Sequence, residues 1–319
     1  MQNAPTLDIS VVVPMMNEEE SVTPLYEAVT SAMSAYKRPY ELIIVDDGST
    51  DQTFPILKRL ASNDEHLKVI KFRKNFGQSA AMGAGFLAAK GKVVVTMDGD
   101  LQNDPKDIPA VVEKLENEGH DIVSGWRKNR KDKLIIRKVP SKIANWIVRR
   151  TTRVTLHDTG CSLKAYRRDV VEKIRLYGEM HRFIPALGRI EGARISEIVV
   201  DHHERKFGES KYNITRTFRV IMDLTTLNLL LKYLTNPLHF FGALTCGFLG
   251  FSMLATLGFL GTLLFGNELI AEELNIQGSL IFLTLAAAAN FVFFGLVGQM
   301  VVQSGEKRDE RLYDVQQYS

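Results

Sequence analysis

Residues 93–102 read VVVTMDGDLQ, an apolar run that ends in two closely spaced carboxylates. The run of Val, Thr and Met is typical of a buried strand. Asp98 and Asp100 follow it, and Gln102 lies two residues further on. Two like charges this close disfavour each other unless a positive charge lies between them. A solvated turn is one interpretation, since Asp and Gly are common in turns, and a divalent metal ion is the other.

Short apolar strands alternate with helical segments between residues 8 and 200. We expect strands at 8–15, 40–48, 67–74, 92–98 and 120–127, and helices at 17–36, 49–63, 79–90 and 107–119. Asn17 is the expected N-cap of the first helix, and Ser49 or Thr50 that of the second. This alternation predicts an open, mostly parallel α/β sheet.

Polar clusters follow four of these expected strands. They read PMMNE, DDGSTD, DGDLQ and GWR. In open α/β sheets, ligands bind beyond the carboxyl ends of the strands. The four clusters are therefore expected to meet at one edge of the sheet and to form a binding site there.

The overall composition excludes some classes of protein. The 319 residues carry a net charge of +3, which does not suggest a nucleic-acid partner. The two cysteines, Cys161 and Cys246, are far apart, so no disulfide framework is expected. The first residues, MQNAPTLDIS, lack the basic and apolar regions of a signal peptide.

Two long segments near the C-terminus contain no Asp, Glu, Lys or Arg: residues 233–267 and 275–304. About 20 apolar residues in a helix cross a bilayer core. We therefore expect transmembrane helices at 235–266 and 276–304, although two buried core helices would give the same pattern. Basic residues flank the pair and the connection at 267–275 carries only acidic charges, so the positive-inside rule places the domain at 1–212 and the tail at 305–319 in the cytoplasm. Residues 213–234 have a basic start and an apolar end, which predicts an amphipathic helix on the membrane surface.

Several motifs together resemble glycosyltransferase family 2. They are VVVPMMNEEE, IIVDDGSTDQT, FRKNFGQSAAMGAGFLAAKGKVVVTMDGDLQNDP, DTGCSLKAYRRD and ERKFGESKY. The likeness extends to the polyprenyl-phosphate glycosyltransferases, a group that includes dolichyl-phosphate mannose synthase and the bacterial GtrB-type glucosyltransferases with two C-terminal spans. The resemblance implies a GT-A fold, a nucleotide-sugar donor, Mg²⁺ or Mn²⁺, and a polyprenyl phosphate acceptor, with inversion at the anomeric carbon. UDP-glucose and undecaprenyl phosphate are the expected substrates, and GDP-mannose or another nucleotide sugar stays open.

The resemblance also assigns roles to individual residues. It places the metal at Asp98, Asp100 and Gln102, in agreement with the preference of hard cations for oxygen ligands. Asp100 and Asp158 are the expected catalytic residues, with Asp158 either a base or an orienting group, since a phosphate monoester is already mostly ionised at neutral pH. The expected acceptor-phosphate ligands are Arg127, Ser210 and Lys211. The expected donor-binding residues are Pro14, Met16, Glu18, Val45, Asp47, Asp98, Gly99 and Arg205.

Two other functions are compatible with parts of this pattern. A processive polysaccharide synthase would carry a Gln-x-x-Arg-Trp motif and more spans, and the sequence has neither. A nucleotide-binding membrane scaffold or flippase-like protein would not need Asp158 beside the DGDLQ motif. The two-helix anchor also offers a surface for a homo-oligomer.

Overall fold

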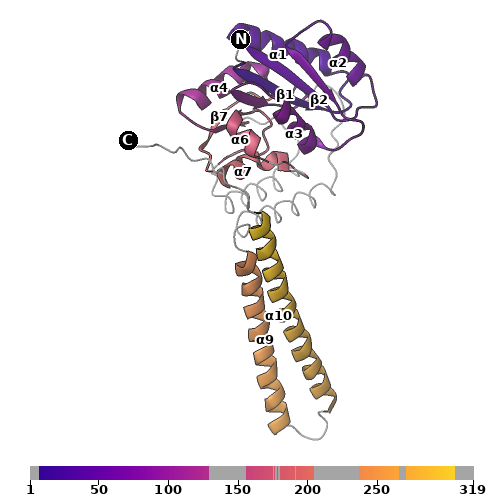
Figure 1. Ribbon diagram of the computed structural model, residues 1–319, viewed down its shortest axis with the longest axis vertical. Helices are drawn as coiled ribbons and strands as arrows, with labels where there is room; N and C mark the ends of the chain where they lie inside the picture. The colour runs from indigo at the N-terminus through magenta and orange to yellow at the C-terminus, as the bar shows by residue number, and fades with distance from the viewer. Residues whose placement is uncertain are drawn as a thin grey trace. The chain divides into compact units, whose positions relative to one another are not determined.

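The computed structural model describes residues 7–128, 156–204 except 175, 177, 179 and 191, 237–265 and 271–305 (Figure 1). The chain divides into two compact units, Met1–Thr225 with Arg311–Ser319, and Thr226–Glu310. The expected amphipathic helix at 213–234 lies outside the described residues, as do Arg205, Ser210 and Lys211.

The first unit is built on one seven-stranded sheet of order β3-β2-β1-β4-β6-β5-β7. Its strands are β1 (Ile9–Met15), β2 (Tyr40–Asp46), β3 (Leu67–Lys71), β4 (Val93–Thr96), β5 (Ile122–Trp126), β6 (Lys164–Arg167) and β7 (Ile195–Val199). All pairings are parallel except those of β6, which runs antiparallel to both β4 and β5. The residues just before β6 therefore lie at the same edge as the residues that follow the parallel strands. The prediction of a mostly parallel α/β sheet is confirmed, whereas β6 and β7 were not anticipated.

Helices cover both faces of the sheet (Figure 1). One core contains α1 (Val22–Tyr36), α2 (Thr53–Ala61) and α4 (Ile108–Asn117), which follows the short η1 turn (Pro105–Asp107). The other contains α3 (Gln78–Ala88), α6 (Arg168–Lys173) and, after η2 (Met180–Phe183), the start of α7 (Ile184–Ile190). Successive side chains of a strand point to opposite faces, so Val11 and Val13 belong to the first core and Val12 to the second.

The starts of the first two helices differ from the sequence prediction. α1 begins at Val22, and Asn17 lies before it with a left-handed φ of 53°. α2 begins at Thr53, whose N–H is accepted by Oδ1 of Asp51 at 2.9 Å. The predicted caps at Asn17 and at Ser49 or Thr50 are therefore wrong, because these polar groups bond to each other across two loops instead.

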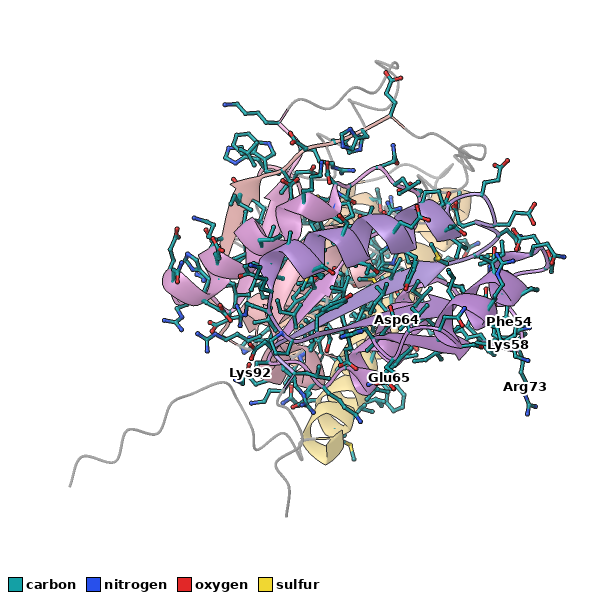
Figure 2. The ribbon with its side chains drawn as sticks, turned by 90° about the horizontal axis from the view of Figure 1, so that it is seen from above. Phe54, Lys58, Asp64, Glu65, Arg73 and Lys92 are labelled. Carbon is teal, nitrogen blue, oxygen red and sulfur yellow. The ribbon has the colours of Figure 1, made fainter. Side chains whose placement is uncertain are left out.

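The outer strand β3 carries charged side chains. Lys68 and Lys71 belong to it, and the Lys71 ammonium lies 3.9 Å from the centroid of the Phe54 ring. Arg73, just after β3, and Lys58 of α2 project outward from this part of the fold (Figure 2). Lysines on an edge strand oppose pairing with a second sheet.

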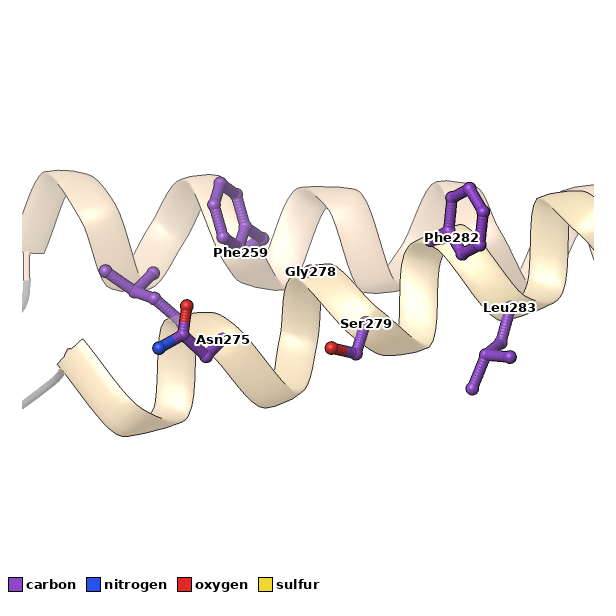
Figure 3. A pocket seen from close by; sticks show the side chains of 7 residues that line it. Phe259, Asn275, Gly278, Ser279, Phe282 and Leu283 are labelled. Atoms are coloured by element: carbon purple, nitrogen blue, oxygen red, sulfur yellow. The ribbon is translucent and has the colours of Figure 1, made fainter.

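The second unit is a helical hairpin of α9 (Pro237–Phe265) and α10 (Ala271–Gly305). Pro237–Leu264 and Leu274–Val301 are each long and apolar enough to cross a bilayer. Thr262 Oγ1 donates a hydrogen bond to Gln277 Oε1 at 3.0 Å, which joins the two helices through polar groups. An open groove of about 650 Å³ lies beside this contact, between Phe259 and the first turns of α10 (Figure 3).

Candidate active site

The loops after β1 and β2 are fastened together by reciprocal hydrogen bonds. The N–H of Asn17 donates to Ser49 Oγ at 2.9 Å, and the N–H of Thr50 donates to Asn17 Oδ1 at 2.8 Å. The N–H of Glu18 donates to Thr53 Oγ1 at 2.9 Å. The predicted donor residues Met16, Glu18 and Asp47 thus lie on two adjacent loops, and Pro14 lies near the end of β1. Val45, the remaining predicted donor residue at this edge of β2, has its side chain buried in the core.

Asp47 is held by a third loop, which follows β3. Its two carboxylate oxygens accept from the N–H groups of Phe76 at 2.7 Å and Gly77 at 2.9 Å. Gly48 has a left-handed φ of 73°, and a Cβ there would lie 2.4 Å from the carbonyl carbon of Lys74. Only glycine allows this approach. The segment 74–77 is therefore part of the same site, a role that the sequence prediction did not give it.

The DGDLQ segment follows β4 and carries the two predicted metal-binding carboxylates. Asp98 is partly buried, and its Oδ1 accepts from Gln78 Nε2 at 2.7 Å. Asp100 is 7% exposed, and its Oδ1 accepts from the N–H of Gln102 at 3.2 Å. Desolvation, followed by the nearby charge of Asp100, raises the pKa of Asp98. A Cβ on Gly99 would lie 2.8 Å from the side-chain carbons of Met15.

The oxygen atoms of this loop suit a divalent cation. Carboxylate and amide oxygens are the ligands that Mg²⁺ takes in proteins, and Mn²⁺ accepts the same set. Two carboxylates in a desolvated place also favour a cation between them. In the described part of the chain, no group of three or more His, Cys, Asp or Glu side chains is placed to hold a metal. The protein thus offers a partial ligand set, which fits a cation that also binds substrate phosphates and water.

Arg127 and Asp158 form an ion pair at the same edge. Arg127 follows β5 and Asp158 precedes β6, and Nε and Nη2 of the arginine lie 2.7 and 3.1 Å from Oδ2 and Oδ1 of the carboxylate. The two side chains are only 11% and 13% exposed. Burial lowers the pKa of Arg127, but the Asp158 carboxylate outweighs this and leaves it above its usual value. The N–H of Gly160 also donates to Asp158, at 3.1 Å. Asp158 is therefore a fixed, paired carboxylate.

The sequence prediction missed two polar residues between these groups, the buried Lys164 and the partly buried Ser162. Lys164, at the start of β6, is 3% exposed and donates to the carbonyl oxygen of Cys161. Burial lowers its pKa, and Cys161 and Asp158 oppose that effect. Ser162 contacts the DGDLQ loop directly. Only the antiparallel pairing of β6 brings these residues to the site, and no local sequence pattern signals that pairing.

The site therefore gathers carboxylates, an amide and an arginine on loops that meet at the carboxyl edge of the sheet. The family model described as Glycosyl transferase family 2 matches residues 10–175, which include every one of these loops. This chain belongs to glycosyl transferase family 2. It is thus a glycosyltransferase.

Two curated relatives cover nearly the whole chain. Dodecaprenyl-phosphate galacturonate synthase of Rhizobium johnstonii is 44% identical over 309 residues, which are 95% of this chain and 90% of the relative. Undecaprenyl-phosphate 4-deoxy-4-formamido-L-arabinose transferase of Pectobacterium atrosepticum is 38% identical over 302 residues, which are 92% of this chain and 88% of the relative.

Solved structures show the same fold. Glucosyl-3-phosphoglycerate synthase from Mycobacterium tuberculosis, in complex with Mn²⁺, uridine diphosphate and phosphoglyceric acid, has a TM-score of 0.53 at 19% identity. The match covers 70% of this chain and 78% of that one. This likeness supports the GT-A fold of the first unit.

Proposed function

We propose that the protein transfers a sugar from a nucleotide sugar to polyprenyl phosphate at a membrane surface. The observation that carries this proposal is that the DGDLQ loop and the Arg127–Asp158 ion pair lie at the same edge of the sheet. The oxygen ligands of the DGDLQ loop suit a metal on a diphosphate, and the Arg127–Asp158 pair beside them suits a second phosphate. The two relatives described above, which cover 95% and 92% of this chain, are both named for sugar transfer to a polyprenyl phosphate.

The helical hairpin supports a lipid acceptor. Two 28-residue apolar stretches, Pro237–Leu264 and Leu274–Val301, suit a membrane anchor. The basic flanks of the hairpin favour an arrangement with the catalytic unit and both termini in the cytoplasm, in a plasma membrane crossed twice. This anchor would keep the catalytic unit at the membrane, where the phosphate of a lipid acceptor lies at the headgroup plane. An enzyme with a soluble acceptor would not need such an anchor.

In the proposed reaction an acceptor phosphate oxygen attacks the anomeric carbon of the donor. A new C–O bond forms to the lipid phosphate while the C–O bond to the donor diphosphate breaks. The nucleoside diphosphate leaves with the bonding electron pair, and the anomeric configuration inverts. A bound Mg²⁺ or Mn²⁺ would neutralise the charge that grows on this leaving group.

The residues of the chain have separate parts in this proposal. Asp98, Asp100 and Gln102 would hold the metal, with Asp98 oriented by Gln78. Asp158 uses two N–H groups of Arg127, and a guanidinium has five, so donors remain for a phosphate oxygen. Asp158 then acts as the group that orients Arg127. The proposed phosphate contacts of Arg205, Ser210 and Lys211 lie outside the described residues.

The sugar is the finer part of the proposal. We place UDP-galacturonate first, because the relative with 44% identity is named for galacturonate. The sequence resemblance alone favours UDP-glucose, but neither relative described above is named for glucose. A donor panel of UDP-galacturonate, UDP-glucose and GDP-mannose, each radiolabelled, would test this choice with undecaprenyl phosphate and Mn²⁺.

The expected result is label in the lipid extract with UDP-galacturonate and none after EDTA. Label only with another donor would change the sugar and keep the chemistry. Nucleotide binding without label from any donor would support the alternative of a nucleotide-binding scaffold or flippase-like protein.

A further inference from the structure

The hydroxyl of Ser162 bridges the two ends of the DGDLQN loop. It accepts the N–H of Asp98 at 3.2 Å and donates to Oδ1 of Asn103 at 2.6 Å. Asp98 begins the loop and Asn103 closes it, so one side chain spans the segment that carries both metal-binding carboxylates. Asn103 is 3% exposed, which makes its hydrogen bond costly to lose.

The backbone of Ser162 is itself fixed. Its carbonyl oxygen accepts from Thr96 Oγ1 at 2.9 Å, in the last residue of β4. Its chain neighbours Cys161 and Leu163 are both fully buried. The amide of Asn103 also lies 3.7 Å from Cys161 Sγ. The bridge is therefore anchored in the sheet and does not depend on a mobile loop.

The middle of the loop adopts an unfavourable backbone conformation. Leu101 has a φ of 60°, in the left-handed region that residues other than glycine and asparagine rarely adopt. Leu101 separates Asp100 from Gln102, so this conformation sets the relative direction of the two side chains. Backbone strain of this kind persists where the surroundings hold it in place, and it is concentrated at functional sites.

We propose that Ser162 is a positioning residue for the metal ion. By holding Asp98 and Asn103, its hydroxyl keeps Leu101 in the left-handed conformation that presents Asp100 and Gln102 to one divalent cation. The inference rests on the proposed metal-dependent transfer for its purpose. Its test needs only metal and nucleotide, so it does not depend on the lipid acceptor or on the sugar.

The test measures Mn²⁺ binding to the full chain in detergent, in the presence of uridine diphosphate, by the loss of the free Mn²⁺ electron paramagnetic resonance signal. Ser162→Ala removes the bridge, and we expect the apparent Kd for Mn²⁺ to rise about tenfold, as two hydrogen bonds are lost. Ser162→Thr keeps the hydroxyl, and its Kd should stay within about threefold of the wild-type value.

A second substitution separates positioning from a general loss of structure. Glycine adopts a φ of 60° without strain, so Leu101→Gly combined with Ser162→Ala should restore Mn²⁺ affinity to within about threefold of wild type. Leu101→Ala combined with Ser162→Ala is the matched control, because alanine loses the same packing but keeps the Cβ that makes the conformation unfavourable. It should not restore affinity.

Three results would overturn the inference. One is wild-type Mn²⁺ affinity in a folded Ser162→Ala protein. Another is equal rescue by glycine and alanine at position 101, or rescue by neither. The third is no Mn²⁺ binding by the wild-type chain with uridine or guanosine diphosphate. Failure of sugar transfer to lipid, with the expected binding pattern intact, would refute the proposed function alone.

Discussion

Replacing Asp158 with asparagine separates an orienting role from a role as general base. Asparagine keeps one oxygen and replaces the other by an NH₂ group, which cannot accept from Arg127. In the wild-type protein the two charge-assisted hydrogen bonds are 2.7 and 3.1 Å long. In the variant one of them is lost and the other becomes weaker. A hydrogen bond to a charged group contributes about 1.5–3 kcal/mol. We therefore expect kcat/KM for undecaprenyl phosphate to fall about 10- to 100-fold.

The pH dependence of the rate gives the sharper result. The second pKa of a phosphate monoester is about 6, so the rate should decline below that pH in both the wild-type protein and Asp158→Asn. Initial rates of label transfer into the lipid extract between about pH 5.5 and 8.5 would measure this. A loss above about 10⁴-fold that also abolishes the acid limb would refute the orienting role and show a general base.

A double-mutant cycle tests whether the pair acts as a unit. Arg127→Gln alone removes the proposed phosphate ligand and leaves Asp158 with no arginine to orient. If Asp158 acts only through Arg127, adding Asp158→Asn to Arg127→Gln should cost no further activity. Additive losses in the double variant would show that Asp158 has a separate contact with a substrate.

Three further substitutions test the metal ligands and the stability of the fold. Asp100→Ala should abolish metal-dependent transfer and leave the thermal melting temperature unchanged. Asp104→Ala is the control: it removes a carboxylate that accepts the N–H of Lys106, and it should keep turnover. Full activity of Asp100→Ala, with metal still required, would refute the assignment of Asp100 as a metal ligand. Burial raises the pKa of Glu41, but hydrogen bonds from Lys68 and Ser10 outweigh burial and leave the pKa of Glu41 lowered in the folded protein. The ionised Glu41 carboxylate therefore stabilises the fold above about pH 4.3. This stabilisation is lost as the pH falls through the pKa of the folded state. Glu41→Gln should therefore lower the free energy of unfolding by about 2 kcal/mol at pH 7 and by less at lower pH, and an equal or larger loss in acid melts would contradict this reasoning.

Local patterns in the sequence were enough to predict the strands β1 to β5 and the polar clusters that follow four of them. The apolar run at 93–96 and its terminal carboxylates are visible in VVVTMDGDLQ, and the structure places Asp98 and Asp100 after β4 as expected. The hairpin also follows from local composition, since the long uncharged runs coincide with α9 and α10. These features depend on neighbours in the chain.

Features that depend on distant pairing were not predictable from local patterns. Asp158 meets Arg127 across 31 residues because β6 pairs antiparallel with β5. The antiparallel pairing of β6 with β4 brings Ser162 to Asp98 across 64 residues. Asn17 failed as a helix cap because its amide oxygen bonds to the N–H of Thr50, a partner 33 residues away. These contacts depend on which strands are neighbours in the sheet, and the composition of a segment does not reveal its neighbours.

In the proposed reaction a lipid phosphate oxygen is the nucleophile, and replacing the acceptor tests this role of the phosphate. The full chain in detergent would receive Mn²⁺ and the best labelled donor, with undecaprenyl phosphate, undecaprenol, or no lipid. We expect metal-dependent label in the lipid extract with undecaprenyl phosphate only, in a product of inverted anomeric configuration. Equal labelling of undecaprenol, or release of free sugar as the sole product, would contradict it.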